Sequence, residues 1–364
     1  MNSPSPLLRL ADGVHLWSPT PSAGWGLANC GLIVSPDGTA AWIDSPYDRR
    51  MAQDFLERSR SLLPEGGRIG RVIVTHANGD HLWGAEVVRG ADIVATREAL
   101  GHIEYEPAPK QLHAMVRGSD PETPLGWYLQ SHFGRFDWAD TEVVEPTTTF
   151  TGELDLRIGQ VPVQLTALPA AHTTGDLIAY LPQQKVAFTG DVIFASSPDD
   201  PGDHAVHWAG PLDSVIAACE RVLDTGAQTI VPGHGPVLDR EGVRGHIGYL
   251  EHIRDRAREL HTAGVPALEA ARKLIAENAF PLPGLPERMV ITVGTEYRHL
   301  NGGEDRPDIV AMIAVVAQVA WDLRQGCPLH SPPRCRTRRI TFTARGGKSP
   351  PTVLVFGVPM HLFS

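Results

Sequence analysis

The sequence predicts an α/β protein with a helical C-terminal extension, and three observations support this. Short apolar runs bounded by turn residues alternate with segments of helical spacing as far as residue 241. Only helical spacing recurs over residues 242–326, and from residue 327 the composition shifts to Pro, Arg and Gly. We therefore expect an α/β domain over 1–241, a helical extension over 242–326, and a basic tail over 327–364 that is poorly ordered.

The order of the expected elements indicates layers of strands and helices. Strands are expected at residues 14–17, 31–34, 40–43, 72–74, 92–95, 142–150, 154–158, 161–168, 177–181, 186–189 and 229–231. Helices are expected at residues 48–63, 82–88, 212–223, 247–261, 266–277, 289–299 and 308–323. The last of these places Ile309, Met312, Ile313, Val316 and Ala320 on one face, which suits a core contact better than a subunit contact.

Residues 97–141 interrupt this order with four prolines and an aromatic group made of Trp127, Tyr128, Phe133, Phe136 and Trp138. We expect an irregular, partly helical insertion. Its aromatic residues suit either a satellite hydrophobic cluster or a lid over a site, and the two roles are compatible.

Composition bounds the class of protein. The formal net charge is −10, and since residues 327–364 carry +6, residues 1–326 carry −16. An acidic chain disfavours nucleic acid and anionic membranes as partners. Four widely spaced cysteines form no disulfide framework, and no apolar run is long enough to cross a bilayer. We expect a cytoplasmic protein, and either a homo- or a hetero-oligomer remains open.

A group of metal-competent side chains follows the strand at 72–74. His76, Asn78, Asp80 and His81 fall within six residues, directly after Val72-Ile73-Val74. A strand that ends in imidazoles and a carboxylate can hold a metal ion at the edge of a sheet.

Three later turns repeat this arrangement. His172, Asp191 and His234 each follow an expected strand and stand next to or near a glycine, where the backbone turns tightly. A single such residue is usually a solvated turn residue. Four strand-end elements in this order indicate one shared site.

With these motifs the chain resembles the metallo-β-lactamase superfamily over about residues 12–240. The resemblance implies an αββα sandwich with a metal site between the sheets at one edge. It also implies a first metal position at His76, Asn78 and His172, a second at Asp80, His81 and His234, and Asp191 as the bridge. The implied cofactor is zinc, one or two ions, with iron or manganese as alternatives.

Asn78 departs from the family pattern, which has a second histidine at this place. An amide oxygen is a poorer zinc ligand than a neutral imidazole. We therefore expect unequal affinity, with the second position filling first. Neutral drift with both metals retained is the alternative.

The expected chemistry is attack by metal-bound hydroxide, because a divalent cation lowers the pKa of bound water to ~7. Asp80 would orient the hydroxide. If the first position stays empty, His76 or His172 becomes free to act as general base.

The leading hypothesis is a metal-dependent hydrolase of a small molecule. The resemblance leaves lactones, thioesters, β-lactams, sulfate esters and activated aryl ethers open, and the aromatic insertion favours an aromatic or apolar substrate. Two alternatives remain: an iron-dependent oxidoreductase of the same fold, and a non-catalytic metal-binding protein.

Overall fold

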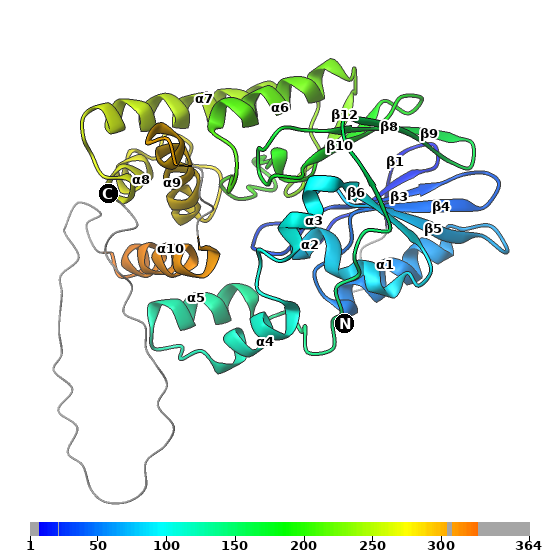
Figure 1. Cartoon of the computed structure of the whole chain (residues 1–364), viewed down its shortest axis with the longest axis horizontal. Coiled ribbons are helices and arrows are strands. Elements are labelled where there is room, and N and C mark those ends of the chain that lie inside the picture. Colours follow the sequence, from blue (N-terminus) through cyan, green and yellow to red (C-terminus); the bar gives the residue numbers. More distant parts are fainter. Residues whose placement is uncertain (1–6, 21, 304–307, 327–364) are drawn as a thin grey trace, which may run out of the picture.

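Two β-sheets pack face to face with helices on both outer faces, which confirms the predicted α/β sandwich (Figure 1). The computed structural model describes residues 7–20, 22–303 and 308–326. The first sheet contains, in spatial order, β1 (Leu8–Ala11), β2 (Val14–Trp17), β3 (Cys30–Val34), β4 (Thr39–Ile43), β5 (Arg68–Ile73), β6 (Asp92–Thr96) and β7 (Thr148–Phe150). The second contains β12 (Thr229–Val231), β11 (Val186–Phe188), β10 (Leu177–Leu181), β9 (Val161–Ala167) and β8 (Glu153–Ile158).

Strand directions gather several chain turns at one edge of the sandwich. In the first sheet, β4 and β5 pair in parallel, so the turns that follow them lie at the same end. In the second sheet, β10 is antiparallel to both β9 and β11, and β11 is parallel to β12. The strands β9, β11 and β12 therefore run in one direction, and the turns after them meet.

The helices and helical turns separate the strands and then continue after the last one. They are α1 (Arg49–Ser61), α2 (Gly79–Leu82), η1 (Trp83–Val87), α3 (Arg97–Ile103), α4 (Pro109–Gly118), α5 (Pro124–Phe133), η2 (Gly190–Val192), α6 (Leu212–Asp224), α7 (Arg240–Thr262), α8 (Ala267–Glu277), η3 (Pro286–Arg288), α9 (Met289–Leu300) and α10 (Ile309–Arg324). Among these described elements, α1 lies beside the first sheet, whereas α6 and α7 lie along the second (Figure 1).

The core between the sheets comes from alternate positions of the strands. Val14, Ile33 and Ile73 of the first sheet share one buried cluster with Leu165 and Leu177 of the second. A strand buries every second side chain on one face, so this pattern holds the two sheets together.

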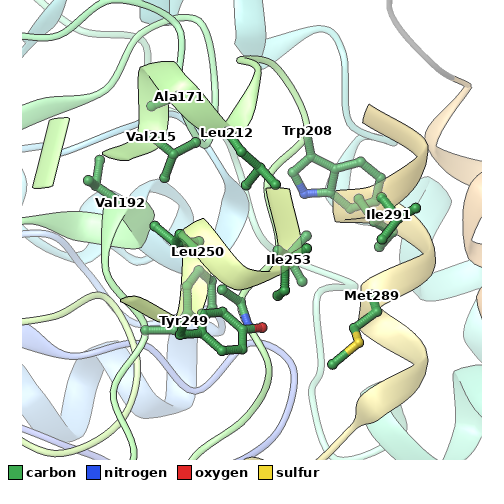
Figure 2. Packing of buried hydrophobic residues seen from close by; sticks show 14 of the residues in the cluster. Ala171, Val192, Trp208, Leu212, Val215, Tyr249, Leu250, Ile253, Met289 and Ile291 are labelled. Atoms are coloured by element: carbon green, nitrogen blue, oxygen red, sulfur yellow. The ribbon is translucent and has the colours of Figure 1, made fainter. Parts of the chain in front are cut away.

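The C-terminal helices pack on the sandwich instead of forming a separate body. Figure 2 shows Leu250 and Ile253 of α7 near Met289 and Ile291 of α9, in a single cluster with residues of α6. The helix α10 packs against α5 of the insertion. Their contact includes Trp127 and Trp321, whose ring centroids lie 5.6 Å apart. None of the described helices has the length and apolarity that a membrane span requires.

Several element predictions need correction. The segment 97–141 is more regular than expected, because it folds into α3, α4 and α5. The expected strand at 142–150 is short, since only Thr148–Phe150 pairs with β6. The helix expected at 82–88 begins earlier, at Gly79, so Asp80 and His81 lie on a helix. The basic tail lies outside the described residues, and the division at 241 stays a prediction.

The contact between α1 and the first sheet gives a test of the fold. Phe55 is fully buried, and its ring stacks on Trp42 with centroids 4.4 Å apart. Phe55→Ala should therefore lower the free energy of unfolding by about 3–5 kcal/mol through lost packing and a cavity. Urea unfolding measures this, with the exposed Glu57→Ala on the same helix as control. A loss below about 1 kcal/mol would contradict this packing.

Candidate metal centre

The structure places all seven predicted side chains at one edge of the sandwich. His76, Asn78 and the helix α2 with Asp80 and His81 follow β5. His172, Asp191 and His234 follow β9, β11 and β12, respectively. Six of the seven are buried, and Asp80 keeps 15% of its side chain exposed. The gathered residues are His76, Asn78, Asp80, His81, His172, Asp191 and His234.

Each of the four imidazoles has its Nδ1 fixed by a neighbouring acceptor. The pairs are His76 with Thr75 Oγ1 (3.1 Å), His81 with Asp44 Oδ2 (2.8 Å), His172 with the Val206 carbonyl (2.5 Å) and His234 with the Leu27 carbonyl (3.2 Å). The Thr75 hydroxyl can accept because it donates its own proton to Asp44. With Nδ1 as the donor, each ring turns Nε2 inward, which is how metal-binding histidines are usually oriented.

The inward-facing atoms converge on Asp191. Its Oδ1 lies 3.1 Å from His81 Nε2 and 3.4 Å from His234 Nε2, and its Oδ2 lies 3.5 Å from His172 Nε2. His234 Nε2 also lies 3.3 Å from Asp80 Oδ2. Two sets of three donors each lie within 4.8 Å of one another: His76, His81 and Asp191, and Asp80, His81 and His234.

The electrostatics of the cluster favour positive charge at its centre. Burial would lower the pKa of His81, but Asp191, Asp44 and Asp80 raise it well above its ordinary value. Burial would lower the pKa of His234 as well, but the carboxylates of Asp191 and Asp80 raise it to about 9. Burial would raise the pKa of Asp191, yet His234 and His81 hold this pKa well below the usual range. Without a metal ion, protonated imidazoles compensate the buried carboxylates.

The donor set fits a divalent metal ion. Within this cluster, His76 Nε2 has no hydrogen-bond partner among the described residues, and His81 Nε2 and Asp191 Oδ1 lie closest to each other, at 3.1 Å. Leaving buried polar atoms unpaired is costly, and imidazole nitrogens with carboxylate oxygens are the ligands that zinc and iron take. Burial, with the neighbouring imidazole of His81, also keeps the pKa of His76 well below its ordinary value, so His76 is neutral and able to bind.

Two glycines allow the last turns to approach the centre. A Cβ on Gly233 would lie 1.9 Å from Asp191 Oδ1, and a Cβ on Gly190 would lie 2.4 Å from Thr75 Oγ1. Gly190 also has φ of +52°, a region that residues with a side chain rarely adopt. Asn29, just before β3, donates hydrogen bonds to the carbonyls of Pro232 and Gly235, which ties the His234 turn to the first sheet.

A pocket with mostly apolar walls opens above the centre. Its floor includes Asn78, Asp80, His172, Asp191 and His234. The apolar walls come from the insertion, from α10 and from loops: Trp25, Pro107, Leu112, Met115, Leu125, Leu129, Phe133, Phe194, Val206, Trp208, Ile309, Val310 and Ile313. The insertion is therefore a wall of the site and also a packed cluster.

The loop after Asp191 carries His204, His207 and Trp208, and of these three only Trp208 lines the pocket. His204 is buried and contacts the Tyr249 hydroxyl at 3.0 Å. His207 is also buried, with its ring centroid 6.0 Å from that of His172. Of the three, Trp208 is therefore the residue placed to contact a molecule in the pocket.

Sequence reasoning missed two carboxylates. Asp44 binds both His81 and Thr75, and its position at the end of β4, beside β5, was a usable signal. Glu106 accepts hydrogen bonds from Asn78 and from the Gly79 amide. Its position in the insertion gave no local signal.

The chain belongs to the metallo-beta-lactamase superfamily. The model of that family matches residues 23–234, more than half of the chain. The chain is 22% identical over 237 residues to a metallo-beta-lactamase type 2 of Bacillus cereus, covering 64% of this chain and 74% of that protein. It is 23% identical over 208 residues to a beta-lactamase-like protein 2 homolog of Caenorhabditis elegans, covering 57% and 56%.

A solved structure shares the fold over a larger part of the chain. It is a stereoselective inverting sec-alkylsulfatase from Pseudomonas sp., with a TM-score of 0.60 and 16% sequence identity. The match covers 88% of this chain and 57% of the sulfatase. Because it covers so much of the chain, the shared architecture extends beyond the part that the family model matches.

The metal-free protein should lose stability as the pH rises. The pKa of His234 lies at about 9 in the fold against 6.5 ordinarily. A raised pKa stabilises the fold below the unfolded value, and this contribution disappears as the pH rises through the folded value. With a chelator present, wild type should lose up to ~3 kcal/mol more than His234→Asn between about pH 6 and pH 9.5. Urea unfolding at both pH values measures this, and equal losses would contradict the charge assignment.

Proposed function

We propose that this protein is a metal-dependent hydrolase of small molecules with an apolar body. One observation carries the proposal: four imidazoles face the Asp191 carboxylate or lie next to rings that do, and two of them, with Asp191 itself, form the floor of a pocket whose walls are apolar. Members of the metallo-beta-lactamase superfamily are mostly metal-dependent hydrolases, and this agrees with the donor set.

Seven residues would hold the metal ions. His76, Asn78 and His172 form the first position, and Asp80, His81 and His234 the second, with Asp191 shared between them. A bound divalent cation supplies a Lewis acid and lowers the pKa of a coordinated water to ~7. Zinc is the proposed ion, and manganese and iron suit the same ligands less closely.

The chain's own groups position the reactants. Of the predicted catalytic residues, Asp80 and His172 line the pocket. Asp80 keeps a carboxylate oxygen 3.3 Å from His234 Nε2, so it can accept a hydrogen bond from an attacking water and orient it. His172 is held by the Val206 carbonyl, and burial lowers its pKa, which leaves a neutral Nε2 for a ligand or a proton.

The pocket selects for apolar substrates. Leu112 and Met115 of α4, Leu129 and Phe133 of α5, and Ile313 of α10 surround the space above the floor. Apolar walls exclude water from the reacting groups and bind the body of a substrate by burial. Lactones, thioesters, β-lactams, sulfate esters and activated aryl ethers with such a body are the proposed substrates.

A substrate panel tests the reaction class. The zinc-loaded protein should hydrolyse at least one of these five classes, and chelation should abolish the activity until zinc is restored. His234→Ala should lower kcat/KM at least ~100-fold through loss of a ligand, whereas the exposed His252→Ala should not. Absence of hydrolysis in every class, with fully metallated protein, would rule out the proposal.

The apolar wall gives a second prediction. Met115→Trp narrows the pocket from the α4 side, so it should lower kcat/KM more for substrates with long acyl or alkyl groups than for their short homologues. A set of esters of increasing chain length measures the ratio, and we expect it to change at least ~10-fold, as steric exclusion of a few methylenes would give. An equal effect on all chain lengths would place the substrate body elsewhere.

A further inference from the structure

Glu106 makes two contacts at the edge of the metal centre, and both use its carboxylate as acceptor. Oε1 accepts a hydrogen bond from Asn78 Nδ2, and Oε2 accepts one from the Gly79 backbone N–H at 2.9 Å. The amide nitrogen of Asn78 faces Glu106 in this contact, as an acceptor-only carboxylate requires. The amide oxygen then points the other way, toward His172.

Glu106 also caps the N-terminus of α2, which the Asn78 side chain does not do. Asn78 is the N-cap residue of α2, a place where asparagine usually accepts a hydrogen bond from the first turn of the helix. Its side chain makes no such bond, and Glu106 takes the first N–H of the helix instead. The Asn78 side chain is thereby free to serve the centre.

The atoms facing each other across the first position are both acceptors. Asn78 Oδ1 lies 3.0 Å from His172 Nε2. The Nδ1 proton of His172 goes to the Val206 carbonyl, so in the neutral ring Nε2 carries a lone pair. Two lone pairs directed at one another repel, unless a cation lies where they converge. His76 Nε2, unpartnered in the described residues, belongs to the same side of the centre.

We infer that Glu106 is a positioning residue for the first metal position, because it holds the Asn78 amide with Oδ1 turned toward the ion. An amide oxygen is a weak zinc ligand, and a fixed orientation lowers the cost of using it. The inference rests on the metal centre of the proposed function. It assigns Glu106 no contact with substrate.

The position of Glu106 connects this clamp to the substrate wall. Glu106 lies between α3 and α4, next to Pro107, and both residues line the pocket together with Leu112 of α4. The carboxylate that holds Asn78 is therefore part of the same wall that would contact a substrate.

The test measures zinc affinity without substrate, by competition with a chromophoric chelator. Wild type should bind two ions with unequal affinity, and His234→Ala identifies the second position by removing it. Glu106→Ala should weaken the first position about 10–100-fold, as loss of an orienting partner does, and leave the second within about threefold. Glu104→Ala, an exposed carboxylate two residues earlier, is the matched control.

A double-mutant cycle separates positioning from general support. If Glu106 acts through Asn78, Glu106→Ala should add little to Asn78→Ala at the first position. An undiminished effect in that background, a parallel loss at both positions, unchanged affinities, or a wild type that binds a single ion would each overturn the inference. Glu106→Gln, nearly isosteric, replaces Glu106→Ala if the latter fails to fold. A chain that meets the metal predictions and hydrolyses nothing would contradict the proposed function alone.

Discussion

The structure depends on the compensation of buried negative charge. Asp44, Asp80 and Asp191 lie among four imidazoles at the edge of the sandwich, and a buried carboxylate is tolerated only when it is paired. Each of these four imidazoles donates its Nδ1 proton to a fixed acceptor and turns Nε2 inward. Because the carboxylates are also directed inward, the centre needs positive charge from protons or from metal ions. The strand ends, glycine turns and bridging loops all serve to bring these groups together.

The topology explains how residues far apart in the chain meet. The two sheets are joined next to the centre by the hydrogen bond from Leu177 N to Thr75 O, 2.8 Å long, and by the contacts of Asn29 with the His234 turn. Apolar walls of the pocket come from α4, α5 and α10, of which α5 and α10 pack on each other. The C-terminal extension thus contributes to the wall of the pocket as well as to the core.

Local patterns in the sequence predicted a large part of this arrangement. His76, Asn78, Asp80 and His81 form one continuous motif after a strand, and the later residues repeat its strand-end setting. The face of α10 was predicted as core, and the structure divides it: Val316 is buried, whereas Ile309 and Ile313 line the pocket.

The remaining features depend on contacts that no local pattern records. Asp44 matters because β4 and β5 pair in parallel, which sets it beside Thr75 and His81. Glu106 reaches Asn78 across a separation of 28 residues, from a segment that looked irregular. Glu106 also accepts the first backbone N–H of α2, whose own N-cap side chain makes no capping hydrogen bond.

The most direct test of the account is a crystal structure of the zinc-loaded protein with anomalous diffraction at the zinc edge. We expect two peaks within the donor cluster, one contacted by Asn78 Oδ1, His76 and His172, and one by Asp80, His81 and His234, with Asp191 between them. Peaks outside this cluster, or an Asn78 amide turned with its nitrogen toward the ion, would contradict it.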